Sequence, residues 1–258
     1  MLKPKRSFSE DVPHLAIDVL PETERASAGT LWRQLFEFGN IVERFDVALA
    51  LLDLSEQLIG GDRSAREAEA AEAAKVSALA EAMSVFGSKD EGWYPKRWAE
   101  LAARAAAVAG WDFQETMQGV CRNLGESPTL RQMITDTDLY EIIEQFKHIF
   151  PNAKDLRHGA AHPSAGLNFF QKHATEHLDG NVTGIELRGV ENVVVNALHG
   201  RTLLITFEKK CMQLDITEET LQTLCKFRKK TYDVFRPATE KMKQMWFEKY
   251  GLARSFPQ

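Results

Sequence analysis

The chain has 258 residues, of which 44% are apolar and 27% are charged, a composition typical of a folded globular protein that buries its own core. Its net charge of −5 argues against a protein that coats nucleic acids without preference, but it leaves room for a local basic patch. No apolar run is long enough to span a bilayer, no signal peptide is readable, and the cysteines Cys121, Cys211 and Cys225 include no close pair. We therefore expect a cytoplasmic protein that does not contact membranes.

The first part of the chain predicts a leader and a long helix. Residues 1–28 contain three prolines and mixed charge, so we expect an irregular segment with a short packed piece at 14–20. Apolar residues recur at three- and four-residue steps from about 30 to 59, which predicts a helix with one buried face that ends at Gly60-Gly61. A second helix, rich in Ala and Glu, is predicted from Ser64 to about Phe86.

Three further helices are predicted in the middle of the chain. Pro95 suits the first turn of a helix that runs to about residue 109, and Asp112 opens another that ends at Gly125. A fifth amphipathic helix is predicted from about 138 to 150, directly before Pro151.

The character of the sequence changes near residue 180. Apolar and polar residues alternate in three stretches, which predicts a three-stranded antiparallel meander. These stretches are 193–197, 203–207 and 212–216. A fourth strand is expected at 182–187. Thr217 is expected to cap a long helix that runs toward Pro237, and a last helical piece is expected at 239–250.

The sequence thus predicts a mostly α fold: a helical bundle with a small antiparallel β-meander inserted at about 180–216, before the last long helix. We expect an irregular leader at 1–28, an N-terminal helical region at 29–125 and a second helical region at 126–258. One continuous domain over 29–258 is the alternative.

An Arg and a His stand close together in the segment after the fifth helix. Arg157 is followed by His158, by three small residues, and then by His162 and Pro163. A guanidinium is a fixed cation whose donors match phosphate oxygens, and an imidazole exchanges protons near neutral pH. Together the two groups supply much of what phosphodiester cleavage needs without a metal.

This pattern, preceded by an amphipathic helix, resembles the signature of the HEPN superfamily. Those are small all-helical domains, often dimeric, and many are metal-independent ribonucleases in toxin, antiphage and RNA-processing systems. The resemblance covers roughly residues 130–236 if the sheet is an insertion. On a straight helix Arg157 and His162 would point about 140° apart. Gly159 and Pro163 relieve this, and the resemblance implies a homodimer in which two motif helices share one cleft.

The resemblance also implies a role for each residue of the motif. His162 takes the proton of the ribose 2′-hydroxyl or delivers one to the leaving 5′-oxygen, and Arg157 offsets the charge that builds on the phosphate. His158 orients a phosphate, Asp155 pairs with Arg157 or orients a histidine, and Lys154 adds positive charge. No cofactor is expected. The alternative is structural, with Arg157 capping carbonyls or paired with Asp155.

The expected function is that of a metal-independent endoribonuclease of HEPN type, a toxin or antiphage effector with RNA as its substrate and an antitoxin as a candidate partner. A basic stretch could contact RNA phosphates, or could form a plain solvated face. It consists of Lys226, Arg228, Lys229 and Lys230. The alternative function is a HEPN-like dimer that binds a nucleotide, RNA or a partner protein without cutting.

Two pairs of histidines have the spacing of metal ligands on a helix, His158 with His162 and His173 with His177. No carboxylate completes a motif such as His-Glu-x-x-His, and Pro163 disturbs the first pair. We therefore expect no metal site.

Overall fold

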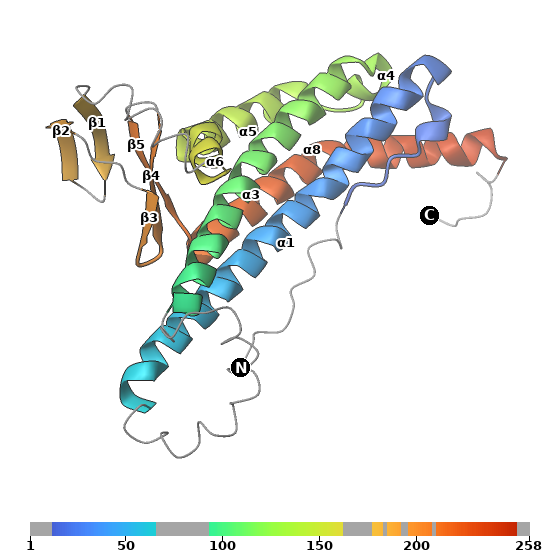
Figure 1. Ribbon diagram of the computed structural model, residues 1–258. Coiled ribbons are helices and arrows are strands. Elements are labelled where there is room, and N and C mark those ends of the chain that lie inside the picture. The colour runs from blue at the N-terminus through green and yellow to red at the C-terminus, as the bar shows by residue number, and fades with distance from the viewer. Residues whose placement is uncertain are drawn as a thin grey trace.

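Helices dominate the computed structural model of the chain (Figure 1). Helix α1 (Glu22–Ala65) packs against both α3 (Trp93–Gly125), which runs antiparallel to it, and α8 (Glu218–Lys249). The predicted fold class is confirmed: the protein is mostly helical, with a small sheet before the last long helix. Among the described residues, no helix combines the length and apolar character needed to cross a bilayer. The structure describes residues 12–65, 93–161, 177–182, 185–191, 196–207 and 210–251.

Helix α1 buries one continuous face, as its sequence predicts. The apolar residues of this face are each at most 5% exposed. They are Leu31, Leu35, Phe38, Val42, Phe45, Leu49 and Leu52. The predicted end at Gly60-Gly61 is wrong, because the helix continues to Ala65. A glycine costs a helix only about 1 kcal/mol, which is too little to end a long helix by itself. Most of the helix predicted at 64–86 lies outside the described residues.

The irregular leader is shorter than predicted. A single 3-10 turn, η1 (Ile17–Val19), lies between the buried residues Leu15 and Leu20, so the packed piece is confirmed. Residues 22–28 already belong to α1. Glu24 explains the early start, since it lies in the first turn, where the helix dipole favours a carboxylate, and accepts hydrogen bonds from the backbone and side chain of Thr129.

The two helices predicted on either side of Gly110 are in fact the single helix α3. Six of its alanines are buried, and α3 packs closely along α1, which such small side chains permit. These alanines are Ala99, Ala102, Ala103, Ala106, Ala107 and Ala109. Packing on both sides of Gly110 therefore outweighs its low helix propensity. The predicted end at Gly125 is confirmed.

Two shorter helices follow α3. A four-residue helix that was not predicted, α4 (Pro128–Arg131), leads to α5 (Asp136–Ile149), which confirms the fifth predicted helix. Phe146 of α5 lies at the centre of the core, with its ring 5.2 Å from that of Phe113 on α3 and 5.2 Å from that of Phe227 on α8. These ring contacts hold α5 against α3 and α8.

The sheet has five strands in the order β2-β1-β5-β4-β3. The predicted meander is confirmed by three antiparallel strands, β3 (Asn196–His199), β4 (Thr202–Phe207) and β5 (Lys210–Asp215). The single fourth strand predicted at 182–187 is wrong. That stretch spans the connection of a hairpin formed by β1 (His177–Val182) and β2 (Ile185–Glu191), and β1 joins β5 in parallel.

The sheet is attached to the helices through its meander. Leu203, Ile205, Met212 and Leu214 are buried and belong to the same apolar cluster as the helical core. At the turn between β3 and β4, Arg201 donates hydrogen bonds to Asp53 and Glu56 of α1. These hydrogen bonds, first of all the one to Glu56, raise the pKa of Arg201.

Helix α8 begins where it was predicted but does not end there. Thr217 is the N-cap residue, and its side chain accepts a hydrogen bond from the backbone of Thr220. The predicted break at Pro237 is wrong, because α8 is continuous to Lys249. Pro237 is exposed, whereas Phe235 and Ala238 beside it are fully buried, so the packed face keeps the helix together.

The buried apolar residues of the leader, the helices and the meander form one cluster. The boundary predicted at 125 falls at the end of α3. The division into two helical regions stays a prediction.

Candidate functional site

The described part of the Arg-His segment, which includes Arg157 and His158, lies on a short helix, α6 (Ala153–Ala161), which Pro151 separates from α5. One face of α6 is buried, because the helix packs against α3 and against strand β4. This buried face consists of Ala153, Leu156, Gly159 and Ala160. The opposite face is exposed and consists of Lys154, Arg157, His158 and Ala161. Helical spacing therefore gathers three of the predicted site residues on one solvent-facing surface.

Gly159 has a different role from the one predicted. It lies inside the regular helix α6, where a β-carbon would overlap the side chain of Ile205 on β4. The glycine therefore permits a close approach of helix to sheet and does not loosen a turn. This contact fixes the orientation of α6, and with it the direction of the face that carries Arg157.

Arg157 is exposed on the surface of α6. Within the described part of the chain, its side chain makes no hydrogen bond and no ion pair. Asp155 is half-buried in the first turn of α6 and does not pair with Arg157, so the structural alternative of an Asp155–Arg157 pair is not formed. Lys154 lies one turn before His158 on the exposed face and adds a second cation to it.

The other half of the predicted catalytic pair is not described. His162, Pro163 and His173 lie outside the described residues. His177 is the first residue of β1. The convergence of Arg157 with His162 therefore stays a prediction. Over the residues that the structure does describe, no three His, Cys, Asp or Glu side chains are grouped so as to hold a metal ion.

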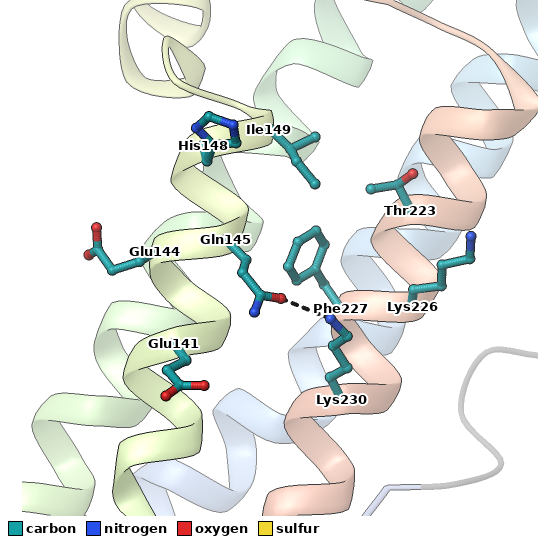
Figure 2. A pocket seen from close by; sticks show the side chains of 9 residues that line it. All are labelled: Glu141, Glu144, Gln145, His148, Ile149, Thr223, Lys226, Phe227 and Lys230. Atoms are coloured by element: carbon teal, nitrogen blue, oxygen red, sulfur yellow. Dashed lines mark hydrogen bonds between the residues drawn. The ribbon is translucent and has the colours of Figure 1, made fainter.

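The basic stretch on α8 does not form one surface. Lys229 makes an ion pair with Asp233, with 2.8 Å between Nζ and Oδ2, and Arg228 lies over the ring of Tyr232. Lys230 points toward α5, whereas the side chain of Lys226 is turned away from it (Figure 2). Lys230 donates a hydrogen bond to Gln145 of α5. The helical period splits the four cations among different contacts.

A groove between α5 and α8 was missed by sequence reasoning (Figure 2). It has a volume of about 650 Å³. Glu141, Glu144 and His148 line it from α5, while Lys226 and Lys230 line it from α8, and Phe227 lies between the helices. The polar residues of α5 recur at three- and four-residue steps, but that pattern does not reveal that α8 lies beside them.

A second groove of about 520 Å³ adjoins the first, and both include Ile149 and Thr223. It runs between the connection from α5 to α6, strand β5 and the start of α8, and Leu156 of α6 lines it. Asp215 and Glu219 also line it, so this surface carries negative charge.

No family model, no curated protein and no solved structure matches the chain.

Proposed function

We propose that the protein is a metal-independent endoribonuclease of HEPN type that cleaves RNA by attack of the ribose 2′-hydroxyl. The observation that carries this proposal is the state of Arg157. Its guanidinium is exposed on a helix that the core holds in place, and it makes no ion pair with any described residue. A guanidinium held in this way is preorganised to bind a phosphate.

The chemistry needs two groups from this segment. His162 accepts the proton of the 2′-hydroxyl as its oxygen attacks the phosphorus, or gives a proton to the 5′-oxygen that leaves. Arg157 binds the phosphate oxygens and stabilises the negative charge that grows on them. The products are a 2′,3′-cyclic phosphate, or the 3′-phosphate that it hydrolyses to, and a 5′-hydroxyl.

Neighbouring residues on the exposed face of α6 support the same reaction. Lys154 adds a cation and His158 adds a donor next to Arg157, so an RNA backbone along this face meets three polar side chains. The resemblance adds a homodimer that shares one cleft, a toxin or antiphage role, and an antitoxin as candidate partner. The mostly helical frame and the amphipathic helix α5 before the motif agree with that resemblance.

The test is an RNA cleavage assay in the presence of a chelator. Total RNA and transfer RNA are incubated with the wild-type protein and with Arg157→Ala, His162→Ala and Arg33→Ala. Arg33 is a matched control, because it is an exposed arginine whose hydrogen bonds to described residues all lie within α1. We expect cleavage by the wild type and by Arg33→Ala, and a loss of at least about 100-fold in the other two variants.

A second candidate function is binding of RNA without cleavage. It is favoured by Lys226, an exposed cation that bonds to none of the residues described in the structure. A folded wild-type protein that retains RNA in a filter-binding assay but cuts none supports this second function and contradicts the first.

A further inference from the structure

The outer face of the second half of α1 carries exposed apolar side chains. Val47 is 60% exposed and Leu58 is 44% exposed. Eleven residues, or three helical turns, separate them, so both point to the same side of α1, away from the face that the core covers. Leu51 and Leu54 lie between them on this side and are half-buried. This half of α1 therefore has two apolar faces, of which the core buries one.

Helix α3 extends this surface. Arg44 of α1 donates a hydrogen bond of 2.9 Å to Asp112 of α3, so these two residues mark the sides on which the helices meet. Leu51 lies two turns after Arg44, and Leu101 lies three turns before Asp112, so both recur on those sides. Leu101 is 60% exposed. An exposed apolar surface of this kind is typical of a place where another segment binds. The outer apolar patch, as we call it, consists of Val47, Leu51, Leu54, Leu58 and Leu101.

The chain itself contains a segment that matches this patch. Residues 66–92 join α1 to α3 and lie outside the described residues. Helix α1 ends and α3 begins at the same end of the bundle, so a much shorter connection would join them (Figure 1). Within this segment, large apolar residues recur at three- and four-residue steps, which predicts one apolar face of a helix. They are Val76, Leu79, Met83 and Phe86.

We propose that residues 76–86 form a helix whose apolar face packs on the outer apolar patch. The face is about 15 Å long, and the patch runs about 16 Å along α1 from Val47 to Leu58. Val47, its far end, lies about 27 Å from Ala65, whereas residues 66–75 span about 33 Å when extended and residues 87–92 span about 20 Å on the return to α3. A segment tethered at both ends is present at an effective concentration of about 1 mM, which favours it over a free partner.

This packing does not involve Arg157, so it is independent of the nuclease chemistry. Hydrogen exchange of the wild-type protein, followed by mass spectrometry on peptides from residues 76–86, is the first measurement. We expect exchange at least about tenfold slower than that of the same sequence without structure, at every protein concentration. Exchange at the unstructured rate would overturn the proposal. Protection that disappears on dilution would also overturn it, because a second copy would then cover the patch.

Substitutions in the patch test which surface the segment uses. Val47→Lys and Leu101→Lys change side chains that the described residues leave largely exposed, so both would be tolerated if nothing else covered them. We expect each variant to lower Tm by at least about 3 °C and to abolish the slow exchange of residues 76–86. Phe36→Lys is the matched control. Phe36 is 45% exposed and lies three turns before Val47 on the same side of α1, but it is about 44 Å from Ala65 and out of reach. We expect this control to melt and exchange like the wild type.

A substitution on the segment completes the test. Met83→Lys should lower Tm and speed the exchange of residues 76–86 as the patch variants do. The double variant Val47→Lys, Met83→Lys should melt within about 1 °C of the less stable single variant, because both changes remove the same contact. Losses of Tm that add in the double variant would contradict the proposal. So would Val47→Lys and Leu101→Lys variants that melt and exchange like the wild type.

Discussion

Gly159 of α6 lies so close to Ile205 of β4 that a β-carbon at position 159 would overlap the isoleucine side chain. This contact connects the helix that carries Arg157 to the sheet inserted before α8. The sheet therefore packs against the buried face of α6, opposite the face that carries Arg157.

Gly159→Ala should destabilise the protein. Alanine favours a helix over glycine by about 1 kcal/mol, but the overlap with Ile205 costs about 1–3 kcal/mol, so the net effect is a loss. Gly110→Ala in α3 is the matched control, because nothing lies within 4 Å of a β-carbon there and the substitution should stabilise the protein. Thermal unfolding of both variants measures this. Two shifts of the same sign would contradict the account.

Tyr232→Phe should weaken the contact between α8 and α1. The buried hydroxyl of Tyr232 donates a hydrogen bond of 2.8 Å to the backbone carbonyl of Leu35. Its loss should cost about 1–2 kcal/mol of the free energy of unfolding, because the ring still fills its place but the bond is gone. Urea denaturation measures the difference. A variant as stable as the wild type would show that this bond contributes nothing.

Pro237→Ala should stabilise the protein by about 1–3 kcal/mol. A proline inside a helix removes one backbone hydrogen bond and crowds the preceding turn, and Pro237 is exposed, so its ring has no packing to lose. Urea denaturation of the variant provides the measurement. Unchanged or lower stability would mean that α8 is adapted to the proline.

The ion pair of Lys229 with Asp233 should make a small contribution that depends on pH. The hydrogen bond from Lys229 lowers the pKa of the Asp233 carboxyl below its ordinary value of 3.8. A carboxyl whose pKa is lower in the folded state stabilises the fold at pH values above 3.8, and this contribution is lost as the pH falls through the folded value.

Asp233→Asn should therefore lower stability at pH 7 by less than about 1 kcal/mol, because the pair is largely exposed to solvent. Its difference from the wild type should shrink as the pH falls below 3.8. Thermal unfolding at pH 7 and in acid provides the comparison. A difference that grows in acid would reverse the predicted sign.

Much of the fold could be predicted because local pattern and packing agree. The buried face of α1, helix α5 and the meander follow from helical and strand periodicity alone. Three helix ends were predicted wrongly, at Gly60-Gly61, at Gly110 and at Pro237. At Gly110 and Pro237, buried neighbours hold the helix together. Tertiary packing decides at such positions, and the sequence around them does not contain it.

The candidate site could be predicted in part for the same reason. The exposure of Arg157, Lys154 and His158 follows from the helical period, since small and apolar residues occupy the other face of α6. The close approach of Gly159 to Ile205 and the groove between α5 and α8 could not be predicted. Both depend on elements that are distant in the sequence and adjacent in the fold.

The chemistry of the RNA ends tests the central claim most directly. Wild-type protein is incubated in chelator with an RNA oligonucleotide whose cleavage site has been mapped. A second oligonucleotide has the same sequence but carries a 2′-deoxynucleotide on the 5′ side of the cleaved bond. We predict 5′-hydroxyl and 2′,3′-cyclic phosphate ends from the first and no cleavage of the second. Arg157→Ala should cleave the first at least about 100-fold more slowly. Fragments with 5′-phosphate ends, or cleavage at the 2′-deoxynucleotide, would contradict an attack by the ribose hydroxyl.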